Sequence, residues 1–183
     1  MIPLQFALRR RMMMTGGGAF EFTYTGQFTD KIEGSKRVIK LTSSGTLDVS
    51  GSVVADVYLL AGGGGSQYAD EYAGGGGGGG NQTLTKLRIA EGSYSISIGK
   101  GGNAGSSSND YMTYCAGTGG STSGFGHTVT GGGGGCTLQY GGARGGAGGS
   151  PNGIAGSTSG GGSPNGGWRR KGGDGYITIT IPV

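Results

Sequence analysis

The chain has 183 residues, of which 49 are glycine, and its net charge is +4. This glycine content, with no strict three-residue period and only four prolines, excludes collagen, and it disfavours long helices because each interior glycine costs about 1 kcal/mol relative to alanine. No run of about 18 apolar residues is present, so we expect no membrane-spanning helix. Three consecutive arginines near the start supply most of the net charge, which argues against the broad basic face of a nucleic-acid-binding protein.

The first 14 residues, MIPLQFALRRRMMM, combine apolar side chains with these arginines. The basic residues follow the apolar ones and no small-residue cleavage site is present, which is not typical of a secretory signal. The segment is compatible with a disordered arm, a short amphipathic helix, a membrane-surface anchor or an arm that docks onto a larger assembly. We expect residues 1–15 to form a docking arm. Its contact residues would be Leu4, Phe6, Leu8, Arg9, Arg10 and Arg11.

Seven segments alternate apolar and polar residues in the way that is typical of strands. They are 19–25, 37–42, 46–49, 53–60, 84–89, 94–98 and 176–181. The three aromatic residues of the first segment share one face, and the alternation in 84–89 predicts that Thr85, Leu87 and Ile89 face inward. His127 lies in a further segment with strand character. Short, mostly antiparallel strands of this kind predict a mainly β protein with a small antiparallel β-sandwich.

Glycine is concentrated in one part of the chain, since 7 lie in residues 1–60 and the other 42 lie between 61 and 175. A flexible linker needs a single glycine tract, whereas here the runs recur and strands lie between them. In a polyproline-II-like conformation a glycine segment has three residues per turn and no internal hydrogen bonds, and without Cβ atoms its backbone can bond laterally to close neighbours. We therefore expect a bundle of polyglycine-II helices. Its scaffold glycines would include Gly62, Gly63, Gly64, Gly65, Gly74, Gly77, Gly80, Gly131, Gly133 and Gly135.

These patterns predict four parts of the chain. The docking arm is followed by a β-strand region at 16–60 and by the glycine-rich bundle with interspersed strands at 61–175. A C-terminal strand at 176–183 completes the sandwich.

The succession of strands and glycine runs resembles a known family. It begins with VYLLAGGGG at 57–65, continues with LRIAEGSYSISIGKGG at 87–102 and GGSTSGFGHTVTGGGGG at 119–135, and ends with GGDGYITITI at 172–181. This pattern resembles the glycine-rich domain of phage tail fibre and receptor-binding proteins, and it is similar to the glycine-rich region of the anaplastic lymphoma kinase receptor family. The resemblance covers about residues 40–183.

The resemblance implies a polyglycine bundle docked on a β-sandwich, carried on a virion tail and used at the host surface. It implies other tail subunits and a host receptor, a glycan or a protein, as partners, and it makes a homo-oligomer such as a trimer plausible. Assembly would take place in the cytoplasm of the bacterial host.

Four loops between glycine segments, at 66–73, 106–116, 136–144 and 163–171, carry most of the aromatic side chains of this region. Tyrosine, tryptophan and arginine are enriched at binding hot spots, although the same rings can cap a bundle that has little else apolar. The residues that we single out for receptor contact are Tyr68, Tyr72, Tyr111, Tyr114, Tyr140, Trp168, Arg169 and Arg170.

Catalytic and metal-binding patterns are mostly missing. His127 is the only histidine, and no His, Cys and Asp cluster has the spacing of a zinc site. Asp70, Glu71 and Asp174 are more typical of solvated surface charge than of a cation site. We expect no enzyme, no cofactor, no metal and no nucleic-acid partner.

Cys115 and Cys136 are the only cysteines. A disulfide between them would close a loop of about 20 residues and contribute roughly 3 kcal/mol in the chain-entropy model. A virion outside the cell permits such a bond, whereas a reducing cytoplasm does not form it at once. Two buried free thiols are the alternative.

From the sequence we expect a tail-associated structural adhesin that binds the host surface through these loops. The alternative is a purely structural virion component, such as a decoration or fibre-joining protein, whose loops contact other virion subunits. A bacterial surface protein is a third reading, which the missing secretion signal weakens.

Overall fold

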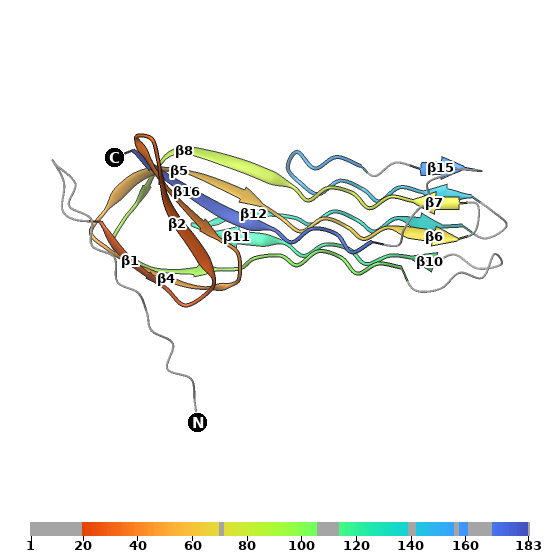
Figure 1. Cartoon of the computed structure of the whole chain (residues 1–183), viewed down its shortest axis with the longest axis horizontal. Helices are drawn as coiled ribbons and strands as arrows, with labels where there is room; N and C mark the ends of the chain where they lie inside the picture. Colours follow the sequence, from red (N-terminus) through yellow and green to blue (C-terminus); the bar gives the residue numbers. More distant parts are fainter. Residues whose placement is uncertain are drawn as a thin grey trace, which may run out of the picture.

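The computed structural model describes residues 20–69, 72–105, 114–138, 142–155, 158–160 and 170–182. The described part is mainly β and contains no helix, so none of it forms a helix able to cross a membrane. A β-sandwich occupies one end of the molecule, and a long bundle of extended segments runs from it to the other end (Figure 1). The expected docking arm, with its six contact residues, lies outside the described residues.

The sandwich consists of two antiparallel sheets. The five-stranded sheet has the order β2 (Phe28–Glu33), β3 (Lys36–Leu41), β16 (Tyr176–Pro182), β5 (Val53–Leu60) and β8 (Asn81–Ile89). The three-stranded sheet has the order β1 (Glu21–Tyr24), β4 (Gly45–Ser50) and β9 (Gly92–Ile96). A hairpin of β11 (Thr122–Gly124) and β12 (His127–Val129) bridges to the residue after β9 through Ser97 and Ser123. All seven expected strands are confirmed, and His127 lies in a strand.

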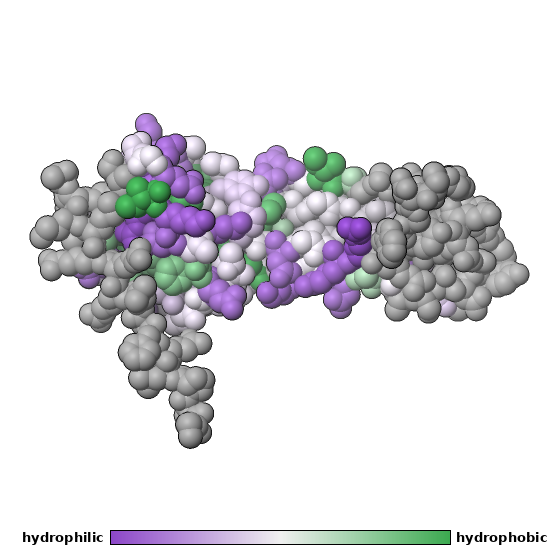
Figure 2. All heavy atoms as spheres, viewed as in Figure 1, coloured by the Kyte–Doolittle hydropathy of each residue, from purple (hydrophilic) through white to green (hydrophobic). Residues whose placement is uncertain are grey.

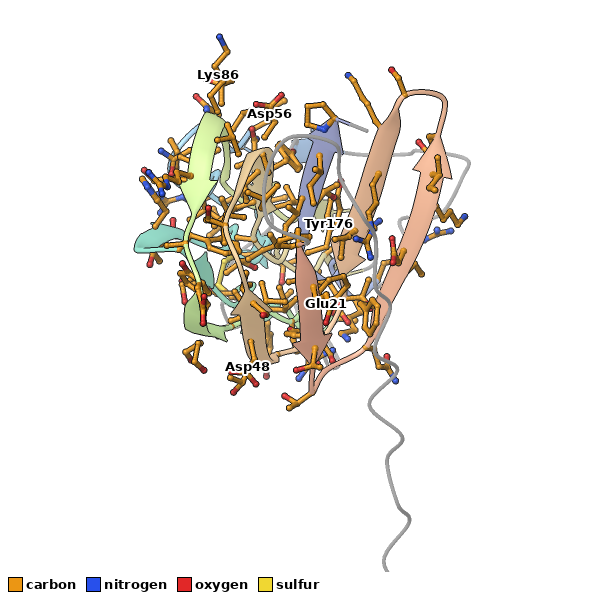
Figure 3. All side chains as sticks on the ribbon, turned by 90° about the vertical axis from the view of Figure 1, so that its left-hand side faces the viewer. Glu21, Asp48, Asp56, Lys86 and Tyr176 are labelled. Atoms are coloured by element: carbon orange, nitrogen blue, oxygen red, sulfur yellow. A yellow bond between two sulfur atoms is a disulfide. The ribbon has the colours of Figure 1, made fainter. Side chains whose placement is uncertain are left out.

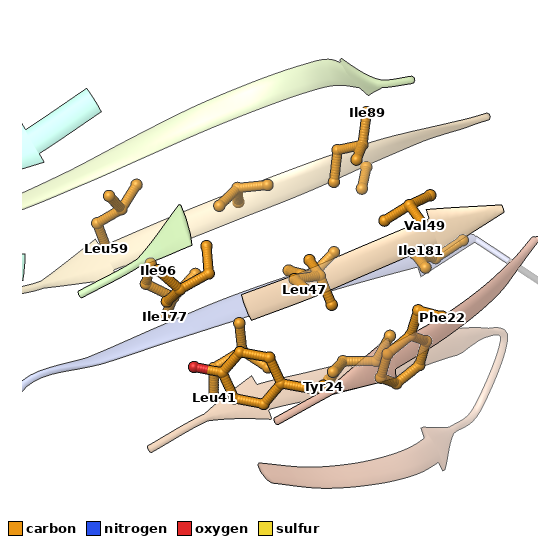
Figure 4. Close-up of a cluster of buried hydrophobic side chains, with 14 of the residues drawn as sticks. Phe22, Tyr24, Leu41, Leu47, Val49, Leu59, Ile89, Ile96, Ile177 and Ile181 are labelled. Atoms are coloured by element: carbon orange, nitrogen blue, oxygen red, sulfur yellow. The ribbon is translucent and has the colours of Figure 1, made fainter. Parts of the chain in front are cut away.

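The inner faces of the two sheets supply the hydrophobic core (Figure 4). Leu47 and Val49 of β4 face Ile177 and Ile181 of β16, and all four are at most 5% exposed. They alternate with exposed residues in β4 and with half-buried residues in β16, and this alternation places one face of each strand in the core. Tyr24 also points inward, and burial raises the pKa of its hydroxyl to about 12.

The expectation about β8 is right for Leu87 and Ile89 and wrong for Thr85. Leu84 packs against the core with Leu87 and Ile89, whereas Thr85 is exposed. The pairing of β8 with β5 shifts register at a bulge, where Lys86 has a φ of 52° and its N–H donates to Asp56 Oδ1 at 2.8 Å (Figure 3). A bulge adds one residue and reverses the alternation beyond it, so simple period-two counting fails there.

The β2 strand was not predicted. Its sequence, FTDKIE, is largely exposed in this edge position and shows no clear alternation. It is held by backbone pairing with β3 and by a buried ion pair, in which Arg37 donates to both carboxylate oxygens of Asp30 at 3.0 and 2.8 Å. Such an edge strand depends on a partner that lies elsewhere in the chain, and a local pattern does not reveal it.

The bundle is built from seven extended segments that bond to one another through the backbone. They are 61–66, 74–80, 99–105, 116–121, 130–135, 145–150 and 170–175. The N–H groups of Gly62 and Gly65 donate to one neighbouring segment, at the carbonyls of Gly120 and Gly117, whereas the N–H of Gly63 points to a different segment. A hydrogen-bond direction that returns every third residue is the signature of a threefold helix, and this confirms the polyglycine-II bundle.

Close approach of the backbones explains why glycine is required. A Cβ added at Gly64 would lie 1.9 Å from the carbonyl oxygen of Gly133, and one added at Gly131 would lie 1.9 Å from that of Gly119. Neither residue has a positive φ, so space, and not backbone conformation, excludes a side chain. Most of the predicted scaffold glycines are equally crowded, with a contact below 3.0 Å. These are Gly62, Gly64, Gly65, Gly74, Gly77, Gly80, Gly131 and Gly135.

Candidate functional site

Two small sheets form the end of the bundle opposite the sandwich (Figure 1). One has the order β15 (Thr158–Gly160), β7 (Tyr72–Gly74) and β6 (Gln67–Ala69), and the other has the order β10 (Tyr114–Cys115), β13 (Cys136–Thr137) and β14 (Ala143–Arg144). We call these six strands the tip. They derive from parts of the chain that are far apart in sequence, and they include residues from three of the four predicted loops.

The tip begins where glycine gives way to residues with side chains. Residues that carry a Cβ do not fit between the closely spaced glycine backbones, so the segments continue as short antiparallel ladders. In the first sheet Gln67 pairs with Gly74, Tyr68 with Ala73 and Ala69 with Tyr72. The second sheet packs against the first, and a Cβ at Gly74 would lie 2.5 Å from the carbonyl oxygen of Cys136.

A disulfide joins Cys115 of β10 to Cys136 of β13. The two residues are directly paired in the ladder, with their Cα atoms 4.0 Å apart. Of the two alternatives that the sequence left open, the structure therefore contains the cross-link and not the free thiols. The bond therefore links two strands of the tip whose cysteines are 21 residues apart in the sequence.

The structure brings several of the predicted contact residues to the tip or its base. Tyr68 and Tyr72 lie in β6 and β7, and Tyr114 lies half-buried in β10. The exposed Arg170 lies at the base of the tip, where its backbone forms two hydrogen bonds with Ser66. The Ser66 N–H donates to the carbonyl of Arg170, and the Arg170 N–H donates to Ser66 Oγ.

The other four predicted contact residues lie outside the described part of the chain. They are Tyr111, Tyr140, Trp168 and Arg169.

Two side chains of the tip were missed by the sequence reasoning. Arg144 of β14 is exposed, and Leu138 just after β13 is 40% exposed. Both lie in the 136–144 loop. The signal that would have found Arg144 is the enrichment of arginine at binding surfaces, in a loop that was singled out for its tyrosine.

Two strands of the tip each bury a polar side chain. Gln67 is 1% exposed and Thr137 is 4% exposed, and their side-chain polar atoms have no hydrogen-bond partner in the described structure. Burying such groups without partners costs roughly 1–3 kcal/mol each. No sequence pattern predicted these two buried polar side chains.

Three charged residues of the bundle, Lys100, Lys171 and Asp174, form a cluster on its surface. The carboxylate of Asp174 accepts hydrogen bonds from the N–H of Gly101, at 2.8 Å, and from the ammonium groups of Lys171 and Lys100, at 3.2 Å each. The backbone hydrogen bond from Gly101 is the largest cause that lowers the pKa of Asp174 to about 2, and the two lysines lower it further. Two ammonium groups already neutralise this carboxylate, and within the described ranges no three His, Cys, Asp or Glu residues gather as metal ligands.

On the face in Figure 2, the bundle is neutral to hydrophilic apart from small apolar patches.

Comparison with known proteins identifies the domain family of the chain. No curated protein and no solved structure matches it. The family model of a glycine-rich domain matches residues 42–180, which include most of the sandwich strands and all seven bundle segments. The chain therefore belongs to this glycine-rich domain family.

Proposed function

We propose that the protein is a structural adhesin of the phage or prophage tail, and that its tip binds the host cell surface. The observation that supports this most is the convergence of distant loops at one end of a stiff bundle. The first and last described residues, Phe20 and Pro182, lie in the sandwich at the opposite end (Figure 1). Attachment through the sandwich and the N-terminal arm would leave the tip free.

The bundle would act as a rigid spacer. Residues 74–80 would span about 22 Å as a polyglycine-II segment, and lateral hydrogen bonds hold this segment to its neighbours along its length. Cross-linking of the tip by the disulfide reduces its freedom further. A binding surface that is already ordered loses less entropy on contact, which favours affinity without a large interface.

The residues of the tip fit recognition of a glycan or a protein better than catalysis. Tyrosines lie in three of its six strands, and Arg144 is exposed in β14. Aromatic faces and guanidinium groups bind sugar rings and polar polymer groups. Several copies on one particle, as in a homotrimer, would raise the apparent affinity by multivalency. We propose tail subunits as the other partners, and the virion as the location after assembly in the bacterial cytoplasm.

Binding to bacterial cells tests this function. Fluorescently labelled protein, presented on multivalent beads, would be incubated with a panel of bacterial strains. Four variants would be compared with the wild type: Arg144→Ala at the tip, Trp168→Ala in the predicted 163–171 loop, the matched Arg88→Ala on the exposed face of β8, and a deletion of residues 1–14. Comparison of the two arginine variants distinguishes binding through the tip from attraction to any positive surface charge. The deletion tests whether cell binding needs the N-terminal arm that we propose for assembly.

The adhesin predicts saturable binding to one or a few strains, weakened by Arg144→Ala and by Trp168→Ala, and unchanged by Arg88→Ala and by the deletion. Binding that is insensitive to both Arg144→Ala and Trp168→Ala would contradict the proposal. An absence of binding across the panel, even on beads, would favour the virion component whose tip contacts another subunit.

A further inference from the structure

The central segment of the bundle, residues 61–66, is surrounded on five of six sides. A threefold helix directs its N–H groups to three sides and its carbonyl groups to the three sides between them. The N–H groups donate to three neighbouring segments, at residues 77–80, 117–120 and 170–173. The carbonyl groups accept from two more, at residues 102–105 and 132–135. One carbonyl direction is left.

The carbonyls that point in this sixth direction belong to Ala61 and Gly64, which are three residues apart. Neither accepts a hydrogen bond within the described backbone, although Ala61 is only 2% exposed. The flanking segments, 74–80 and 170–175, are not bonded to each other in the described structure, whereas the other adjacent pairs around the centre are. The packing is therefore interrupted at one place along the side of the bundle.

A groove with a volume of about 340 Å³ lies at this interruption. Its floor includes Ala61 and Gly63 of the central segment, and its walls include Gly78 of one flanking segment and Gly173 of the other. We call it the slot. Ile154, which is 80% exposed, also lines it, so an apolar side chain stands open to solvent beside it.

The glycines of the slot differ from those inside the bundle. A Cβ at Gly63 would be 3.6 Å from the nearest atom, one at Gly78 would be 3.5 Å away, and one at Gly173 would have nothing within 4 Å. None of the three has a positive φ. Neither the packing of this chain nor its backbone conformation therefore requires glycine at these positions. A second backbone lying in the slot would require it, as neighbouring backbones do elsewhere in the bundle.

The charges around the slot favour a neutral occupant. Asp174 lies at its edge, but its carboxylate is already bonded to Gly101 and to two lysines. The carbonyl oxygens of Ala61 and Gly64, which point in the sixth direction, carry a negative partial charge that is complementary to the N–H groups of a peptide. Their three-residue separation, about 9.3 Å, equals the repeat of a polyglycine-II strand.

We propose that the slot binds an extended, glycine-rich strand of another polypeptide, which completes the sixfold packing around residues 61–66. Every third N–H of the incoming strand would donate to Ala61 or Gly64. Side chains larger than hydrogen would be excluded wherever the strand faces Gly63, Gly78 or Gly173. This site lies on the side of the bundle, is separate from the tip, and does not depend on the proposed function.

Capped hexaglycine and capped (Gly-Ala)₃ are the probes, titrated into the intact protein while NMR follows the carbonyl carbons of Ala61 and Gly64. Gly173→Leu fills the slot from a position with free space, and Thr29→Leu on the exposed face of β2 is the matched control. Gly63→Ala is a smaller block in case Gly173→Leu lowers the thermal midpoint.

The proposal predicts saturable shifts of both carbonyl carbons with hexaglycine and at least tenfold weaker binding of (Gly-Ala)₃. It also predicts at least a tenfold loss of affinity in Gly173→Leu or Gly63→Ala, and no change in Thr29→Leu. Three results would overturn it: no saturation at millimolar peptide, equal binding of both peptides, or self-association of the protein that the slot variants abolish, which would make a second copy of this chain the occupant.

Discussion

Two adjacent glycines of the central segment give a matched test of the packing. A Cβ at Gly64 would lie 1.9 Å from the carbonyl oxygen of Gly133, whereas one at Gly63 would lie 3.6 Å from the nearest atom. The two residues share a segment and neither has a positive φ. Gly64→Ala and Gly63→Ala therefore differ in the space available to the methyl group, while their effects on the unfolded chain are the same.

The expected magnitudes follow from the contacts. Real Cβ atoms approach other atoms no closer than about 3.0 Å, so Gly64→Ala must move segment 130–135 away by about 1 Å. That displacement disrupts the hydrogen bonds from Gly132 to Gly62 and from Gly135 to Gly65, both 3.0 Å long. Two backbone bonds that leave buried groups unpaired cost roughly 2–5 kcal/mol in total. Gly63→Ala should instead stabilise the protein by about 0.4–1 kcal/mol, because alanine restricts the unfolded chain.

Thermal unfolding followed by circular dichroism measures both effects. For a domain of this size, about 1 kcal/mol corresponds to roughly 2–4 °C in the midpoint. We expect a fall of about 5–15 °C for Gly64→Ala and a small rise for Gly63→Ala. Equal midpoints for the two variants would refute the close-packed arrangement of these segments.

Three further predictions concern the charged groups and the cross-link. Because the pKa of Asp174 is lowered to about 2 from its ordinary 3.8, its stabilisation is fully present above about pH 4 and is lost as the pH falls through 2. With the side chain 39% exposed, Asp174→Asn should cost at most about 1 kcal/mol at pH 7 and less at pH 2 in urea titrations, and a pH-independent loss would contradict this. Asp30→Ala leaves the guanidinium of Arg37 buried without its carboxylate and should lower the free energy of unfolding in urea by about 3–5 kcal/mol. The double variant Asp30→Leu/Arg37→Met should lower it by less, because no unpaired charge remains buried. An equal loss of stability in both variants would show that side-chain volume matters and charge does not. Cys115→Ser should lower the free energy of unfolding by about 3 kcal/mol, and chemical reduction of the wild type should have the same effect. A reduced wild-type protein with an unchanged urea midpoint would disprove the contribution of the cross-link.

The sequence was most informative where the pattern is local. Alternation in TLDV and YITITI places Leu47 and Ile179 in the core because period two is a property of the strand itself. Recurrent glycine runs predicted the bundle for a similar reason, since they are useful only when several backbones approach one another. The same local counting failed at Thr85, because a bulge that depends on the Asp56 side chain of the neighbouring strand reverses the phase.

The site depended on features that no local pattern contains. Which glycine segments become neighbours is set by the path of the chain, so neither the meeting of β6 with β13 at the tip nor the open side of residues 61–66 was predicted. Gly63 and Gly64 look alike in the sequence. Only the position of neighbouring backbones distinguishes the glycine that the bundle requires from the one that faces the slot.

Amide hydrogen exchange of glycine-labelled protein tests the bundle most directly. The N–H groups of Gly64, Gly77, Gly119 and Gly133 all donate to backbone carbonyls of other segments, at 2.8 Å each. These amides should exchange with protection comparable to that of core residues such as Val57 in the sandwich, because they open only when the bundle unfolds. Exchange at the rate of an unstructured peptide, with the sandwich still protected, would show that the glycine segments are flexible linkers and would contradict the account.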